Sequence, residues 1–435
     1  NVAIGVNALN TLNYDGNGLN VAVGYGAGAA MTTGVQNTIV GGLAGDALTT
    51  GNYNVALGYN ALSTEDEHSA NTAIGFSSLA VLNAGAHGYN TAVGYESGKA
   101  MTTGVQNTLI GGNAGDALVS GDNNTVLGYN AMGAANGSES RNVAIGSNAL
   151  AAMDSDASNY NVAVGYDAGA AVTTGVQNTL IGGLAGDALT DATRNVAVGY
   201  LALSTETSGY RNVAIGAEAL ALANGGNYNT VIGDSAGENI TTADENTIIG
   251  GLAGDALTTG TRNVAIGYHA LGGEDAHGKN VAIGYQALKA QDAGADAYNT
   301  AVGYSVGETM TTGISNTLIG AFAGDALTTG DYNVAIGRSA LSLEDAYGYN
   351  VAIGAFALLN QNAADNAFNV AVGYNAGAAV TTGINNTLVG GNAGDALTIG
   401  NHNVAIGFEA LSASVDGDKN VAIGRRALKV YEDGD

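Results

Sequence analysis

The sequence predicts an all-β protein, a parallel β-solenoid (β-roll) of about 25 coils of 17–19 residues. Three observations predict this fold. A five-residue motif, Asn-(Val/Thr)-(Ala/Val/Leu/Ile)-(Ile/Val/Leu)-Gly, recurs throughout the 435 residues. The side chains of the motif alternate in the way that a β-strand requires. The chain contains 69 glycines but no proline, and fixed internal periods of this kind are typical of stacked repeats.

The composition excludes several other classes of protein. With 46% hydrophobic and 11% charged residues, the chain does not fit intrinsic disorder, and collagen is excluded because proline is absent. The absence of cysteine excludes disulfide scaffolds and thiolate metal sites. A net charge of −26 argues against nucleic acid and anionic membrane surfaces as partners. No apolar run approaches the ~20 residues of a membrane helix, so we expect no membrane insertion.

The motif sets the register of the whole chain. Asparagine opens it and glycine fills its fifth place in all 25 coils, and the step between coils is 17 residues, sometimes 19 and once 18. The opening asparagines are at positions 1, 20, 37, 54, 71, 90, 107, 124, 142, 161, 178, 195, 212, 229, 246, 263, 280, 299, 316, 333, 350, 369, 386, 403 and 420.

A longer period lies above the coil. Four coil types recur in fixed order, which gives six super-repeats of about 70 residues and one terminal coil. We therefore predict a single β-solenoid shaft over residues 1–435. Because Asn1 lies inside a repeat, we take the chain to be a segment of a longer protein.

The pattern within a coil predicts where its side chains point. In Val2-Ala3-Ile4-Gly5, places 2 and 4 share one face and places 3 and 5 share the other. We expect the Ala and Gly face to be the outer one, smooth enough for a sister chain to pack against it in a homo-oligomer. Asparagine side chains stacked at ~4.8 Å are expected to form a hydrogen-bonded ladder, and asparagine tolerates left-handed turns. The fifth-place glycine permits a positive φ or close packing. Twenty-five coils at ~4.8 Å would form a rod of roughly 120 Å.

The motif resembles two known families. The run Asn-Val-Ala-Ile-Gly-Tyr-x-Ala-Leu recurs almost verbatim at 54–62, 263–271 and 280–288. It resembles the head repeats of trimeric autotransporter adhesins, and even more closely the 17-residue repeats of tail-fibre-domain proteins of bacteria and phages. The resemblance implies a left-handed β-roll, a homotrimer and display on a cell surface or virion. Adhesin heads have shorter coils, and neither the adhesin anchor and coiled-coil stalk nor the self-cleaving chaperone domain of the fibres is found here, so both alternatives stay open.

The run Gly41-Gly42-Leu43-Ala44-Gly45-Asp46-Ala47-Leu48 echoes the repeats of calcium-binding toxin rolls. One such aspartate falls in every fourth coil, roughly 19 Å from the next. Since Ca²⁺–oxygen distances are ~2.4 Å, one chain cannot close a calcium site. We expect each aspartate to bond its own turn, with rings of aspartates from symmetry-related chains as the alternative. The later members are Asp116, Asp187, Asp255, Asp325 and Asp395.

Acidic turns offer paired carboxylates, which glycoside hydrolysis needs across a cleft. No insertion exceeds two residues, so we expect a solvated acidic rim, no catalytic residue and no enzyme activity. The turns are Glu65-Asp66-Glu67-His68, Glu274-Asp275 and Glu344-Asp345.

The histidines do not pair at metal or triad spacing, so we expect no metal and no cofactor; they are His68, His87, His269, His277 and His402. Threonine pairs such as Thr32-Thr33 and Thr49-Thr50 occupy two coil types in four, which argues against ice binding.

Ten tyrosines share the sixth place of their coils. Aromatic ladders of this kind can bind sugars or proteins, but stacking between coils or chains is the expected role. They are Tyr25, Tyr59, Tyr95, Tyr129, Tyr166, Tyr200, Tyr268, Tyr285, Tyr304 and Tyr374.

The last coil contains four of the twelve basic residues, Lys419, Arg425, Arg426 and Lys429. This cluster indicates either a junction with a following domain or a solvated cap.

These patterns predict a structural or adhesive segment of an extracellular fibre that projects a binding tip toward an unknown cell-surface receptor or glycan. The first alternative is a phage tail-fibre shaft. The second is a solenoid that binds glycans or cations through its tyrosines or acidic turns. A β-helix enzyme would require a deep cleft.

Overall fold

A computed structural model describes residues 1–430; the part of the predicted shaft at 431–435 lies outside the described residues. The chain divides into two compact units, unit 1 over Asn1–Ala217 and unit 2 from Glu218 onward. Each unit is a parallel β-solenoid, and within residues 1–430 every strand is three residues long and no α-helix occurs. The predicted fold class is confirmed to this extent. The described residues also contain no helix long and apolar enough to span a membrane.

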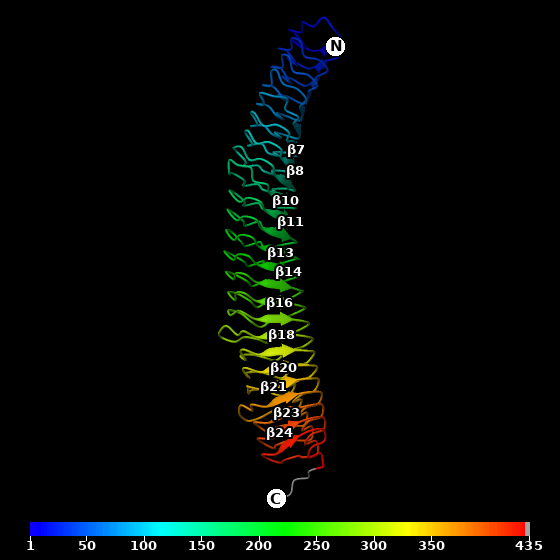
Figure 1. Ribbon diagram of the computed structural model, residues 1–435. Helices are drawn as coiled ribbons and strands as arrows, with labels where there is room; N and C mark the ends of the chain where they lie inside the picture. The colour runs from blue at the N-terminus through cyan, green and yellow to red at the C-terminus, as the bar shows by residue number, and fades with distance from the viewer. Residues whose placement is uncertain (431–435) are drawn as a thin grey trace. The chain divides into compact units, whose positions relative to one another are not determined.

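Unit 1 contains one strand in each coil (Figure 1). Each strand pairs in parallel with the next, so that Val2 lies opposite Val21 and Ala3 opposite Ala22. Its strands are β1 (Val2–Ile4), β2 (Val21–Val23), β3 (Thr38–Val40), β4 (Val55–Leu57), β5 (Thr72–Ile74), β6 (Thr91–Val93), β7 (Thr108–Ile110), β8 (Thr125–Leu127), β9 (Val143–Ile145), β10 (Val162–Val164), β11 (Thr179–Ile181), β12 (Val196–Val198) and β13 (Val213–Ile215).

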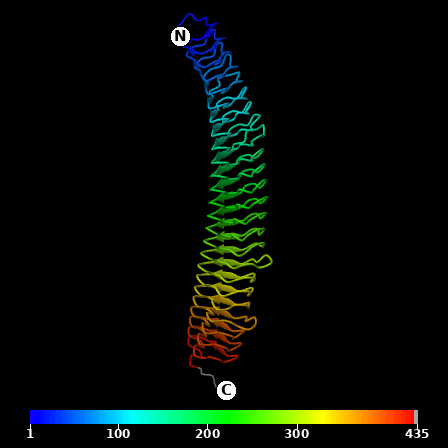
Figure 2. The same cartoon turned by 180° about the vertical axis from the view of Figure 1, so that it is seen from behind.

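Unit 2 repeats the same arrangement of stacked coils (Figure 2). Val264 lies opposite Val281, for example. Its strands are β14 (Thr230–Ile232), β15 (Thr247–Ile249), β16 (Val264–Ile266), β17 (Val281–Ile283), β18 (Thr300–Val302), β19 (Thr317–Ile319), β20 (Val334–Ile336), β21 (Val351–Ile353), β22 (Val370–Val372), β23 (Thr387–Val389), β24 (Val404–Ile406) and β25 (Val421–Ile423).

The predicted direction of the strand side chains is wrong. The third place points inward: Ala22 and Ile39 are completely buried, whereas the flanking second and fourth places are half-buried or exposed. Leu57 and Leu127, both in the fourth place, are 43% and 44% exposed. Alternation alone gives two faces without saying which is inside. Here the third-place residue, alanine or a larger aliphatic residue, faces the core, and the second- and fourth-place residues face outward.

The narrow core explains this choice, because the two sides of a coil fill one space. Where the third place is large, as at Leu180, the ninth place is glycine, and a Cβ at Gly186 would lie 2.8 Å from Leu180 Cδ2. Where the third place is alanine, the ninth place is a buried leucine in some coils, as at Ala197 and Leu203. In others it is glycine, as at Gly28, and side chains of the two neighbouring coils take the space: a Cβ at Gly28 would lie 3.0 Å from Leu9 Cδ2 and 3.2 Å from Ile39 Cδ1. Such complementary volumes keep the core closely packed at constant coil width.

The asparagine ladder forms, but mainly through the backbone. Oδ1 of Asn20 accepts a hydrogen bond from the backbone N–H of Asn37 at 2.9 Å. The Asn37 amide nitrogen donates to the Gly51 carbonyl at 2.9 Å, and at 3.2 Å to Asn20 Oδ1. The side chains of Asn20 and Asn37 are buried, so these bonds satisfy polar groups that water cannot reach. The ladder therefore fixes each coil on its predecessor.

The left-handed conformation occurs one residue earlier than predicted. The residue before the motif has a positive φ, 59° at both Gln36 and Tyr53, while the asparagine that follows each does not. The fifth-place glycine fulfils both of its predicted roles. Gly24 has a φ of 140°, and a Cβ there would lie 2.3 Å from the Gly41 carbonyl oxygen.

Candidate functional site

The outer face of each strand is apolar. We call the second and fourth places of the strands the outer strand face; it carries Val or Thr in the second place and Ile, Val or Leu in the fourth. Besides Leu57 and Leu127, Ile181 in unit 1 and Ile319 in unit 2 are more than a third exposed. The aliphatic fourth-place side chain is half-buried or exposed in every strand, and large exposed apolar surfaces mark interaction sites in soluble proteins.

The sixth-place tyrosines line the solenoid surface and stack along it. Tyr59 and Phe76 stack with centroids 5.7 Å apart, and Phe76 and Tyr95 at 5.4 Å. In unit 2, Tyr285 and Tyr304 stack at 5.1 Å. Stacking between coils is therefore confirmed for these rings, which remain about half exposed.

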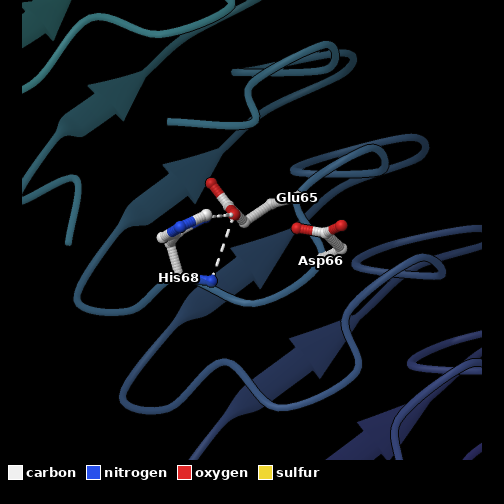
Figure 3. A group of neighbouring side chains, drawn as sticks. All are labelled: Glu65, Asp66 and His68. Atoms are coloured by element: carbon white, nitrogen blue, oxygen red, sulfur yellow. Dashed lines mark hydrogen bonds and ion pairs between the residues drawn. The ribbon is translucent and has the colours of Figure 1, made fainter. Parts of the chain in front are cut away.

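The acidic turns are a solvated rim only in part: Glu67, Asp275 and Asp345 are exposed, whereas the first glutamate of each turn is buried. Glu65 is completely buried, its Oε1 lying 2.8 Å from His68 Nδ1 and accepting the His68 backbone N–H at 3.2 Å (Figure 3). The prediction failed because the carboxylate turns inward to accept backbone N–H groups of its own turn. Glu206 does the same, accepting the Gly209 N–H at 2.6 Å. A buried carboxylate that accepts such bonds stabilises the turn.

Two of these turns bring a histidine to the carboxylates, contrary to the expectation that no histidine has a metal-like setting. In Glu65, Asp66 and His68, one ligand atom from each lies within 4.8 Å of the others. Glu274, Asp275 and His277 repeat the arrangement in unit 2. Imidazole and carboxylate ligands suit divalent transition metals. The same turn is built around Glu344 with Tyr347 in place of the histidine, so the turn itself does not need a metal.

Burial changes the acidity of these carboxyl groups. It raises the pKa of Glu344 to about 6, against the opposing effect of the Tyr347 and Ala363 backbone N–H groups. Burial also raises the pKa of Glu274 above its ordinary value.

The aspartates of the Gly-Asp turns stay separate. They are absent from both metal-like groups found in residues 1–430. Burial raises the pKa of Asp46, while a bond to its own backbone N–H acts in the opposite direction, as expected for a turn residue. Oδ1 of Asp255 lies 3.5 Å from His269 Nδ1, and Oδ1 of Asp325 accepts from Ser342 Oγ at 2.5 Å.

Several of the remaining candidates have structural partners. Oγ1 of Thr32 donates to the Thr49 carbonyl at 3.2 Å, and Oγ1 of Thr49 to the Asp66 carbonyl at 2.9 Å, so both threonines bond to the next coil. In the terminal coil, Arg426 Nε lies 2.8 Å from Glu409 Oε2, which Lys429 also contacts.

A cavity that the sequence did not reveal lies in unit 1. It has a volume of about 280 Å³ and is lined by Asn52, Tyr53, Ser69, Ala70, His87 and Tyr89. Its two tyrosines directly precede motif asparagines. They are not among the tyrosines in the sixth place of each coil, so a prediction from the sixth place alone misses them. The recurrence of tyrosine directly before Asn54, Asn90, Asn161, Asn229, Asn299, Asn333 and Asn350 was the available signal.

No family model matches the chain, and no curated protein matches it. The fold places it in the class of parallel β-solenoid repeat proteins. Its resemblance to adhesin heads and fibre repeats remains a hypothesis carried by the motif.

Proposed function

We propose that this chain is a non-enzymatic shaft segment of an extracellular homo-oligomeric fibre, which holds an adhesive tip away from the surface that carries it. The supporting observation is the direction of the strand side chains. Alanine fills the inside, as at Ala56, and large aliphatic residues stand outside, as at Leu57. A monomer gains nothing from exposing these side chains, whereas packing copies together removes them from water at about 25 cal/mol per Å².

The number of copies and the hand of the coil follow from the resemblance. Adhesin heads and tail-fibre repeats imply three chains and a left-handed roll. In this proposal the outer strand faces of three copies meet around a common axis, and the turns and aromatic side chains face solvent. The partner at the tip is a cell-surface receptor or glycan.

Sedimentation equilibrium of the purified chain tests the assembly. We expect a mass near three times 42.8 kDa at micromolar concentration. Replacing Leu57 and Leu127 together by lysine places charges on the outer strand face, and desolvating them opposes association. The double variant is expected to sediment as a monomer with unchanged circular dichroism.

The matched control replaces Thr33 and Thr103 together by lysine, which adds the same charge at exposed sites outside that face. It should leave the mass unchanged. A mass of 42.8 kDa for the unmodified chain at every concentration would rule out the assembly. Immunogold labelling of intact parent cells and of virions tests the location, and label on one but not the other decides between a cell-surface filament and a phage fibre.

A further inference from the structure

The residues directly before the motif asparagines form a column of outward side chains, which we call the pre-asparagine column. They have left-handed φ angles, 59° at Tyr53, 65° at Ala70 and 48° at Tyr89. Tyr53 and Tyr89 are 60% and 58% exposed. Because the backbone repeats, successive members of this column stand one coil apart, at about 4.8 Å.

In other super-repeats a long side chain covers the aromatic ring of the following coil. The Arg141 guanidinium lies 5.5 Å from the Tyr160 ring centroid, and Lys279 Nζ lies 5.1 Å from that of Tyr298. The equivalent residue in the first super-repeat is Ala70, whose side chain is a single methyl group, too short to cover a ring as Arg141 and Lys279 do. The cavity of about 280 Å³ lies here, between Tyr53 and Tyr89.

Unit 2 shows what such a space can hold. There Tyr349 occupies the place of Ala70, and its ring stacks 5.2 Å from Tyr332 and 5.1 Å from Phe368. Tyr349 and Ala70 share a φ of 65°. Two coil steps therefore separate Tyr53 from Tyr89 by about 10 Å, which leaves room for one ring with a tyrosine on each side.

The remaining lining residues, Asn52, Ser69 and His87, are polar and include no carboxylate, lysine or arginine. Asn52 Oδ1 accepts the Val35 N–H at 2.8 Å, and within residues 1–430 the Asn52 amide nitrogen donates no hydrogen bond. Ser69 Oγ accepts the Asn52 N–H at 2.9 Å, which leaves its hydroxyl proton to donate. His87 stands edge-on to Tyr89, with centroids 6.1 Å apart. None of the six lining residues is Asp, Glu, Lys or Arg.

We propose that this slot, formed by Tyr53, Ala70 and Tyr89 above Asn52, Ser69 and His87, binds one hexopyranose ring of a neutral glycan. A pyranose presents C–H groups on its two faces and hydroxyls around its edge. The electron-rich faces of the two tyrosines suit the C–H groups. The amide, hydroxyl and imidazole suit the hydroxyls. The volume is at the lower end for small-molecule sites, which matches one ring rather than an extended ligand.

The slot does not depend on fibre assembly, since one chain supplies all six residues. Saturation-transfer NMR and titration calorimetry with the full chain and a panel of methyl hexopyranosides test it. The panel contains glucoside, galactoside, mannoside and N-acetylglucosaminide. We expect one or more to bind with a dissociation constant of about 1 mM, as for a small ligand with few contacts. N-acetyltyrosinamide, a probe for a protein side chain, should not bind.

The decisive variant is Ala70→Tyr, which closes the slot as Tyr349 closes its counterpart and should abolish sugar binding. Tyr53→Ala removes one wall and should weaken binding at least tenfold. Tyr160→Ala is the matched control, because this tyrosine holds the same place as Tyr89 but its ring is covered by Arg141. It should bind sugar like the unmodified chain, and all three variants should keep its circular dichroism spectrum.

Three results would overturn the proposal. The first is the absence of binding by every methyl hexopyranoside. The second is sugar binding that survives Ala70→Tyr, which would locate the sugar elsewhere. The third is preferential binding of N-acetyltyrosinamide, which would assign the slot to an aromatic side chain of a protein partner.

Discussion

Two regions of this molecule have the same backbone and different surfaces. The slot in unit 1 is open at Ala70, whereas the closed column of unit 2, Tyr332, Tyr349 and Phe368, is filled by Tyr349. The middle residue has a φ of 65° in both. The difference teaches that the repeat supplies the spacing and that a single side chain decides whether the surface offers a site.

The largest expected effect comes from breaking the scaffold that both regions share. Asn54 Oδ1 accepts the Asn71 N–H at 2.9 Å and its amide donates to the His68 carbonyl at 3.0 Å; Asn333 is its counterpart. Asn54→Ala leaves a buried N–H without a partner, which costs about 1–3 kcal/mol, and loses a second bond of about 1 kcal/mol. We expect each of Asn54→Ala and Asn333→Ala to lower stability by about 2–4 kcal/mol in denaturant titrations.

The exposed threonine variant Thr33→Ala, which keeps the ladder, serves as the control and should change stability by less than about 0.5 kcal/mol. Near-neutral behaviour of both asparagine variants would contradict the role assigned to the ladder.

The repeat made most of the scaffold predictable. Asparagine in the first place and glycine in the fifth set the register of all 25 coils, and the parallel pairing follows from it. The inner face could not be predicted in the same way. Ala3 and Ile4 are both apolar, and the alternation of side chains defines two faces without indicating which one is buried. Close packing across the core decides it, as between Leu180 and Gly186 within one coil and between Gly28 and Leu9 of neighbouring coils.

The slot could not be predicted from the sequence for a different reason. Tyr53 closes a 17-residue coil and Tyr89 a 19-residue coil, so counting from each asparagine puts them in different places although they share one column. The site also depends on what Ala70 lacks, and a missing side chain leaves no motif. The buried state of Glu65 was equally hidden, since the sequence shows a run of charges but not the backbone N–H groups that the carboxylate accepts.

The next effect tests whether the closed column can be opened. Tyr349→Ala removes two stacked contacts, each worth about 0.5–1.5 kcal/mol, and should lower the stability by about 1–3 kcal/mol. It also creates a second ring-sized gap, so calorimetry should detect a second sugar site. That site should be weaker than the first, because Gly348 and Asn366 replace Ser69 and His87. If the stoichiometry of binding stays at one sugar per chain, measured with the methyl hexopyranoside that binds the slot, two aromatic side chains are insufficient without the polar residues Asn52, Ser69 and His87.

The turn beneath the closed column predicts a pH effect of up to about 2 kcal/mol, since burial raises the pKa of Glu344 from 4.5 to about 6. The folded state then holds a proton that the unfolded state releases between these values. The contribution of Glu344 to stability is therefore fully present below pH 4.5 and is lost as the pH rises through 6. Thermal melts at pH 5 and 7.5 should show a higher midpoint at pH 5.

Glu344→Gln should reduce this pH dependence, and the remainder should come from other carboxyl groups whose pKa burial raises, such as Glu274 and Asp395. Equal pH dependence in the variant and the unmodified chain would refute the assignment to Glu344.

The smallest expected effect tests whether a gap beside a single aromatic ring can bind sugar. Lys279→Ala uncovers the Tyr298 ring and removes the ion pair with Asp296 and a hydrogen bond to the Tyr298 hydroxyl. Solvent screens these contacts, so the loss of stability should be the smallest of the series. The opposite neighbour in this column is Arg262, not an aromatic residue, so the new gap has one aromatic wall. We expect no additional sugar site in calorimetry, in contrast to Tyr349→Ala. Sugar binding at this one-walled gap would mean that a single tyrosine suffices, and the distinction between Tyr53 and Tyr89 as paired walls would fail.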